Sequence, residues 1–247
     1  MNEKLLIGDI RIQELQRNLG ANTWPELIQH DEQVNYYWPH LYDEFLDVQF
    51  ALFDDEKLVG IGNAMHLNWQ QPFEELPEGG VRWAMKKATR EAKKEQSSNL
   101  LVAMQILIEQ AYRNQGMSYK MVNIMKQVAS AQGIDHVALP VRPTLKSKFP
   151  LIPMEEYITW VKSDGLPFDP WLRVHLKLGG KIVSVCSRSM YMEGTPLEWE
   201  EWSGMQFPGS GQYIVDRALN PITIDLQSNI GTYVEPNVWV IHKSAEV

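Results

Sequence analysis

Residues 100–141 read LLVAMQILIEQAYRNQGMSYKMVNIMKQVASAQGIDHVALPV. Residues 100–108 form a nearly continuous apolar run, which is typical of a strand buried on both faces. From 118 to 132 the apolar residues recur at the spacing of one helix face, and Gly133 stands where a helix C-cap is expected. Residues 136–141 predict a second strand. The stretch therefore predicts a βαβ unit and an α/β protein.

The turn between the first strand and the helix, residues 110–118, carries the chemical signal. A helix that begins directly after a strand leaves backbone N–H groups unpaired, and with the helix dipole these form an anion site. Gly116 permits close backbone approach or a positive φ, and Ser118 is small. A nucleotide remains an alternative ligand, but the turn lacks the Lys-Ser/Thr pair of a P-loop and the further glycines of a dinucleotide fingerprint. We therefore expect a phosphate cradle.

On both sides of this unit the chain continues as an ordinary globular protein. Residues 48–53 and 58–66 predict a hairpin, and residues 81–94 predict an amphipathic helix with a basic, solvated face. The chain has 247 residues, which suits one domain with insertions. Residues 198–202 and 233–239 mix acids with aromatics, which indicates either a pocket for a cationic amine or, as we favour, packed tryptophans with exposed acids.

Composition excludes several classes of protein and site. The net charge of −8 argues against a nucleic-acid partner, and no apolar run is long enough for a membrane span. The N-terminal residues do not resemble a secretory signal, and the single cysteine, Cys186, suits a reducing compartment, so we expect a cytoplasmic protein. We expect no metal site, because no short ligand spacing links any pair among His66, His136 and His175.

Residues 112–121 resemble the acetyl-CoA signature of the GNAT N-acetyltransferases, Gln/Arg-x-x-Gly-x-Gly/Ala. Arg113 and Gly116 match it, and Ser118 replaces the usual Gly or Ala. The resemblance implies acetyl-CoA as co-substrate, with its pantetheine arm paired to backbone groups of Leu107 and Ile108. It also implies that the pyrophosphate is held by backbone amides of the residues Arg113, Asn114, Gln115, Gly116, Met117 and Ser118.

Two residues are candidates for acid–base catalysis. Residues 174–183 resemble the family's late Leu-Tyr-x-Lys-x-Gly-Phe segment, and His175 takes the place of a tyrosine that is the usual general acid. Strand alternation places Glu109 on the face of Gln105 and Leu107, so Glu109 is the candidate base. Each has a structural alternative: a buried histidine with a structural hydrogen bond, and a solvated carboxylate at the end of a strand. The basic loop 142–148 either contacts the 3′-phosphate of CoA or is simply solvated.

The resemblance implies one acyl-CoA N-acyltransferase domain over residues 1–247. We expect a mixed, twisted central sheet flanked by helices, with its fourth and fifth strands splayed. Two segments depart from a minimal member: an insertion at 143–168, with a helix at 153–161, and an extended C-terminal β region at 191–247. The predicted reaction is direct acetyl transfer from acetyl-CoA to a primary amine of a small molecule or peptide. A non-catalytic CoA-binding or regulatory domain is the alternative, and exposed aromatics leave a homodimer open.

Overall fold

The structure is a computed structural model that describes residues 2–20 and 23–245. Within them nine strands form one mixed sheet, in which β4 and β5 are parallel and the other neighbouring strands are antiparallel. The order is β1 (Glu3–Ile7), β2 (Phe50–Asp54), β3 (Lys57–Leu67), β4 (Leu100–Ile108), β5 (His136–Val141), β9 (Ile230–Lys243), β8 (Ile222–Asp225) and β7 (Gly211–Tyr213), with β6 (Lys181–Gly194) paired to β9. The predicted α/β class, hairpin and βαβ unit are confirmed.

Helices pack on this sheet through their apolar faces. They are α1 (Arg11–Gly20), α2 (Glu32–Tyr37), α3 (His40–Asp43), α4 (Gly80–Ala92), α5 (Met117–Ala131), α6 (Met154–Tyr157), α7 (Pro170–Lys177) and α8 (Pro196–Ser203). In α4 the residues Val81, Ala84, Met85 and Ala88 are buried, so the basic segment is an amphipathic helix, as predicted. None of the helices in the described ranges is long and apolar enough to cross a membrane.

The strands β4 and β5 separate soon after they begin. Their pairing ends at Val102, which lies opposite Ala138. Two residues further along, β4 has a bulge. Ala103 lies opposite Ala64 and Gln105 lies opposite Asn63, so Met104 has no partner on β3. A bulge bends its strand and increases the local twist, which directs the rest of β4 away from β5. The predicted splay is therefore confirmed.

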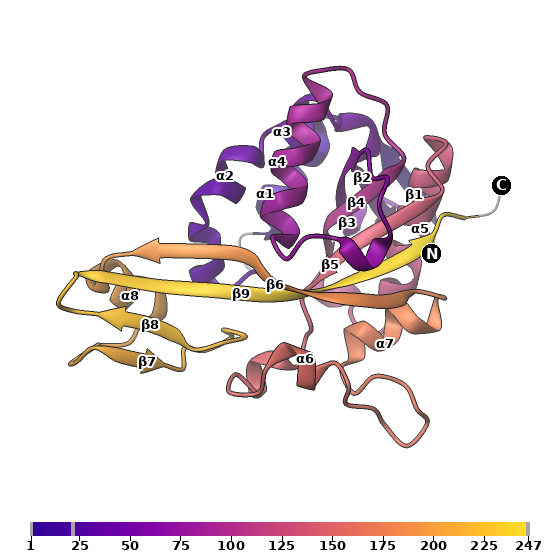
Figure 1. Ribbon diagram of the computed structural model, residues 1–247. Helices are drawn as coiled ribbons and strands as arrows, with labels where there is room; N and C mark the ends of the chain where they lie inside the picture. The colour runs from indigo at the N-terminus through magenta and orange to yellow at the C-terminus, as the bar shows by residue number, and fades with distance from the viewer. Residues whose placement is uncertain (1, 21–22, 246–247) are drawn as a thin grey trace.

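The C-terminal region is inserted into the sheet rather than added at its edge. Figure 1 shows β6 and β9 as a long ribbon that extends beyond the other strands, with α8, β7 and β8 at its far end. The last half of β9 returns to pair with β5. The expected extension at 191–247 thus consists of the end of β6, an excursion at 195–229, and the returning strand. A second, small apolar core joins the excursion to the rest of the molecule: it includes Trp199 and Ile222 of the excursion, Tyr233 of β9, and Leu27.

The insertion at 143–168 is less helical than predicted. Instead of a helix over 153–161, α6 has four residues. The chain then folds back, because Phe168 N donates to the Trp160 carbonyl and Lys162 N donates to that of Leu166. These backbone bonds satisfy groups that a longer helix would have paired. In this turn the aromatic rings of Tyr157 and Trp160 pack against Phe168.

Candidate active site

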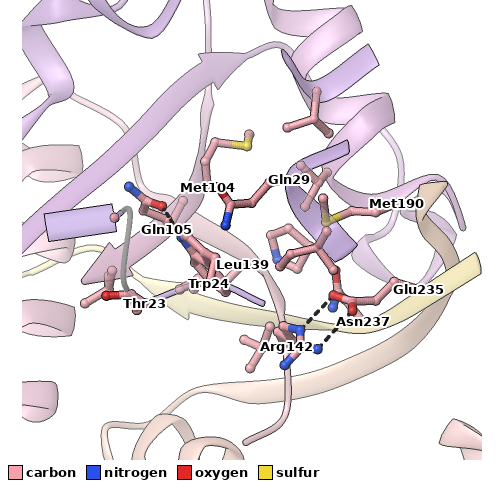
Figure 2. A pocket seen from close by; sticks show the side chains of 18 of the residues that line it. Thr23, Trp24, Gln29, Met104, Gln105, Leu139, Arg142, Met190, Glu235 and Asn237 are labelled. Carbon is pink, nitrogen blue, oxygen red and sulfur yellow. Dashed lines mark hydrogen bonds and ion pairs between the residues drawn. The ribbon is translucent and has the colours of Figure 1, made fainter. Parts of the chain in front are cut away.

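A cleft of about 850 Å³ opens where β4 and β5 separate. Met104, Gln105, Ile106 and Ile108 of β4 form one wall, and residues 139–142 at the end of β5 form the other. The remaining walls come from segments far away in the sequence: the end of α1, residues 23–35, Trp171 of α7, Arg217, and Glu235 and Asn237 of β9. Figure 2 shows that Trp24 and Gln105 lie on one side of this cleft and Arg142 and Glu235 on another.

The predicted CoA loop lies at one end of the cleft and has the backbone of an anion site. Gly116 is the N-cap of α5 with φ of 78°, and a Cβ atom built there would meet nothing within 4 Å. Asn114 also has a positive φ of 61°. The first N–H groups of α5 have no acceptor within the helix, so they are free for an anion. The conformation therefore explains why a glycine is needed at 116.

The structure brings only some of the predicted CoA residues to the cleft. Ile108, Arg113 and Ser118 line it, and the Arg113 Nε donates to the Ile108 carbonyl at 3.0 Å. Leu107 is buried and does not line the cleft. The other four predicted contacts, Asn114, Gln115, Gly116 and Met117, lie at the helix entrance beside the cleft. The backbone contacts to CoA remain a prediction.

A buried ion pair forms the opposite end. The Glu235 carboxylate is fully buried; it accepts from Arg142 Nε at 2.9 Å and Nη2 at 3.1 Å, and from the Tyr233 hydroxyl at 3.0 Å. Arg142 Nη2 also donates to the Arg217 carbonyl at 2.7 Å. Arg142 is thus hydrogen-bonded to protein groups at the cleft wall. Lys146 is buried, and its Nζ donates to two backbone carbonyls. The phosphate role expected of loop 142–148 gains no support from these two cations.

The chain is similar to a named acetyltransferase along most of its length. No family model matches the chain. The chain is 30% identical, over 90% of its own length and 86% of the relative's, to the protein named "Arginine N-acetyltransferase avaD" from Aspergillus versicolor. The chain belongs to the GNAT N-acetyltransferase family. As a member of this family it is an N-acetyltransferase, and the enzyme class predicted from the loop is confirmed.

Solved structures agree on the GNAT fold. The loading GNATL domain of CurA from Lyngbya majuscula superposes with a TM-score of 0.60 at 18% identity, covering 98% of this chain and 97% of that one. A GNAT-like decarboxylase, GphF, in complex with isobutyryl-CoA superposes with a TM-score of 0.58 at 16% identity, covering 98% of this chain and all of that one. These identities establish the fold alone.

Neither predicted catalytic residue of this GNAT protein lines the cleft. His175 is fully buried behind Trp171, and its Nδ1 is 2.9 Å from His242 Nε2. Burial, with a smaller contribution from His242, lowers the His175 pKa to about 3. A general acid must hold a proton near neutral pH and touch the leaving thiolate. His175 meets neither condition, so the structure supports the alternative of a buried structural histidine.

Glu109 also lies outside the cleft lining and makes hydrogen bonds to the backbone. Its side chain accepts from Gln110 N at 2.9 Å, and its own N–H donates to the Val59 carbonyl. The bulge at Met104 precedes Gln105, so residues 105–109 keep the predicted alternation. Of the three residues on the face of Glu109 only Gln105 lines the cleft, so this face does not bring Glu109 to the acceptor. In the described part of the chain, Glu235 is the carboxylate that lines the cleft.

Sequence reasoning missed a chain of buried amides behind the cleft. Trp24 Nε1 donates to Gln105 Oε1 at 2.9 Å, and Gln105 Nε2 donates to Asn63 Oδ1 at 2.8 Å (Figure 2 shows the first of these bonds). Asn63 Nδ2 continues to the Tyr42 hydroxyl and to Gln49 Oε1. The available signal was a glutamine inside an apolar strand, because a buried amide needs partners. These bonds hold the Trp24 indole at the cleft wall.

Proposed function

We propose that this enzyme transfers the acetyl group of acetyl-CoA directly to the primary amine of a small molecule, within one ternary complex. The observation that supports this proposal is the continuity of the site. Arg113 and Ser118, on either side of Gly116, line the same cleft as the residues of β4 after its bulge and residues 139–142. An elongated ligand with an anionic end and a reactive thioester end matches that arrangement.

The reaction assigned to this site needs no covalent enzyme intermediate. The neutral amine attacks the thioester carbonyl, a C–N bond forms and the C–S bond breaks. The amine nitrogen gives up one proton, and CoA leaves as a thiolate that takes one up. Cys186 does not suit a nucleophilic role, because it is fully buried and burial raises the pKa of its thiol. The bulged Met104 leaves backbone polar groups outside the β3 ladder, and an N–H there is our candidate donor to the developing oxyanion.

L-Arginine is the first acceptor to test. The relative from Aspergillus versicolor is named for acetylation of arginine, and the chain matches it along nine-tenths of its length. The cleft volume of about 850 Å³ lies in the range of sites that hold small ligands. Side-chain amides of Gln29 and Asn35 offer polar contacts along its wall.

The test combines binding with turnover. Thermal unfolding is measured with and without acetyl-CoA, because a ligand at ~100 times its dissociation constant adds about 2.7 kcal/mol to the native state. Product formation is then followed by mass spectrometry with L-arginine and a panel of other amines. We expect a raised Tm and an N-acetylated product. No Tm shift at millimolar acetyl-CoA contradicts the proposal, whereas a shift without any product supports the non-catalytic CoA-binding alternative.

A further inference from the structure

The charge of the cleft is opposite to the charge of the chain. The protein carries a net charge of −8, from which a slight preference for cationic amines follows. The charged side chains that line the cleft in the described residues are nevertheless four arginines, at 17, 113, 142 and 217, and one acid, Glu235. Arg113 adjoins the predicted phosphate loop. The other cations face the space left for the acceptor.

Arg142 is fixed in place by its partners and keeps one nitrogen free. Its Nε and Nη2 are bound to the buried Glu235 carboxylate, and Nη2 also reaches the Arg217 carbonyl. Among the described residues no acceptor binds Nη1. A guanidinium whose orientation is already set loses little conformational entropy when it binds a ligand. Arg142 therefore presents a preoriented N–H donor pair to the cleft.

The buried Glu235 carboxylate already uses three of its about four acceptor sites on Arg142 and Tyr233. One of its oxygens accepts from Arg142 Nε, and the other accepts from both Arg142 Nη2 and the Tyr233 hydroxyl. A cationic group that displaced Arg142 would leave the arginine without its buried partner, which is costly. The pair thus acts on the ligand through Arg142 rather than through Glu235.

Arg217 adds a second cation from the C-terminal excursion. It has a positive φ of 62°, which is uncommon for arginine. In this conformation its carbonyl accepts from Arg142, while its Nη2 donates to the Thr23 carbonyl at 2.6 Å, on a segment 194 residues away. Arg217 therefore links two walls of the cleft beside Arg142.

We propose that the acceptor carries a carboxylate next to the acetylated amine, and that Arg142 binds this carboxylate through Nη1 with Arg217 as the second cation. The inference rests on the proposed function, since it specifies the acceptor of that reaction as an amino acid rather than a simple amine. Charge-assisted bonds from guanidinium to carboxylate are among the strongest hydrogen bonds in proteins. Arg142 and Arg217 are specificity-determining residues in this assignment.

The experiment compares amino acids with the amines obtained by removing only their carboxylate. The pairs are L-arginine with agmatine, L-lysine with cadaverine, and L-phenylalanine with phenethylamine. Turnover gives the ratio of kcat/KM within each pair, and calorimetry on CoA-saturated protein gives the ratio of affinities without requiring turnover. We expect the amino acid to be preferred by about 10- to 100-fold, as for loss of a hydrogen bond to a charged group.

The variants remove the cation without leaving a buried charge unpaired. Arg142→Gln combined with Glu235→Gln replaces the ion pair by neutral amides, and Arg217→Ala truncates an exposed side chain. We expect the within-pair preference to fall toward 1 in the double variant and to fall partly in Arg217→Ala. Arg188→Gln is the matched control, because this arginine is exposed and lies outside the cleft, so the preference should be unchanged.

The outcomes separate this inference from the proposed function. Equal affinity and turnover for both members of each pair overturn the inference and leave acetyl transfer standing. A preserved binding preference without any product supports the inference and contradicts the transferase proposal. A preference that survives the double variant but disappears in Arg17→Ala also overturns the assignment, because the carboxylate site would then lie at α1.

Discussion

Gly116 is the residue on which the predicted acetyl-CoA site depends most directly. Its φ of 78° lies in the left-handed region, and the space around its missing side chain is open. Gly165, in the insertion, has nearly the same φ of 75° and is equally open, but its neighbours do not line the cleft, whereas Arg113 and Ser118 on either side of Gly116 do. The two glycines therefore share their backbone conformation and differ in the ligand that we assign to one of them.

Alanine at either glycine is expected to cost about 1–2 kcal/mol of folding stability, because each would hold an L-residue at positive φ. Only Gly116→Ala should also weaken acetyl-CoA binding, by about 10-fold or more, since its methyl group occupies the helix entrance. Urea denaturation gives the first quantity and calorimetry with acetyl-CoA gives the second. Equal affinity of the two variants for acetyl-CoA would place the cofactor elsewhere.

The buried amide chain makes a second prediction about single residues. In Gln105→Leu, Trp24 Nε1 and Asn63 Oδ1 lose their partners, at about 1–3 kcal/mol for each buried group left unsatisfied. In a Trp24→Phe background the same substitution should cost about 1 kcal/mol less, because the indole N–H is already gone. A double-mutant cycle of unfolding free energies measures this coupling. Strict additivity would mean that the Trp24–Gln105 bond does not contribute.

At the scale of elements, α7 is joined to the insertion and to the loop after β5 by one carboxylate. Asp169 Oδ1 accepts from Trp171 N and Leu172 N as the helix N-cap. Its Oδ2 accepts from Leu145 N and the Tyr157 hydroxyl. Because this cap also binds two other segments, its removal is expected to lower the free energy of unfolding more than removal of an ordinary cap.

Thr195→Ala provides the comparison, since Thr195 caps α8 in a capping box near the surface. We expect Thr195→Ala to cost about 1 kcal/mol and Asp169→Ala about 3–5 kcal/mol. Asp169→Asn, which keeps one acceptor oxygen, should fall between them. Thermal unfolding of the three variants tests the order. An equal loss for Asp169→Ala and Thr195→Ala would show that the bonds to Leu145 and Tyr157 contribute nothing.

For the whole molecule, the buried histidine pair makes stability depend on pH. Burial lowers the pKa of His175 to about 3 and that of His242 to about 4, and their rings join α7 to β9. In the unfolded chain both titrate near 6.5, so the unfolded state takes up protons first as the pH falls. Stability is therefore full above about pH 6.5 and is lost progressively toward pH 4.

Between pH 6.5 and 5 we expect the unfolding free energy to fall by up to about 1.4 kcal/mol per pH unit for each of the two histidines. His242→Gln should roughly halve the part of the slope that the pair contributes. Burial also lowers the pKa of His66, which therefore adds the same contribution to the slope in the wild type and in His242→Gln. Urea denaturation at several pH values measures the slope. A slope that His242→Gln leaves unchanged would contradict this assignment.

The βαβ unit, the glycine turn before α5 and the family were predictable from the sequence alone, because each depends on residues close together in the chain. Hydrophobic period, caps and a glycine with positive φ are local properties, and they remain visible without knowledge of the fold. The extent of the short helix α6 was less predictable, since backbone bonds across the insertion end it.

Which side chains line the cleft depends on contacts between segments that are distant in the sequence. Arg142 meets Glu235 across 93 residues and Trp24 meets Gln105 across 81, so no local pattern brings them together. The same holds for His175, whose motif position indicated a catalytic acid until packing against Trp171 and His242 removed it from the cleft. Spacing along a chain determines which face of a helix a residue shares. Whether that face meets a cavity or a neighbouring strand is set by contacts between distant segments.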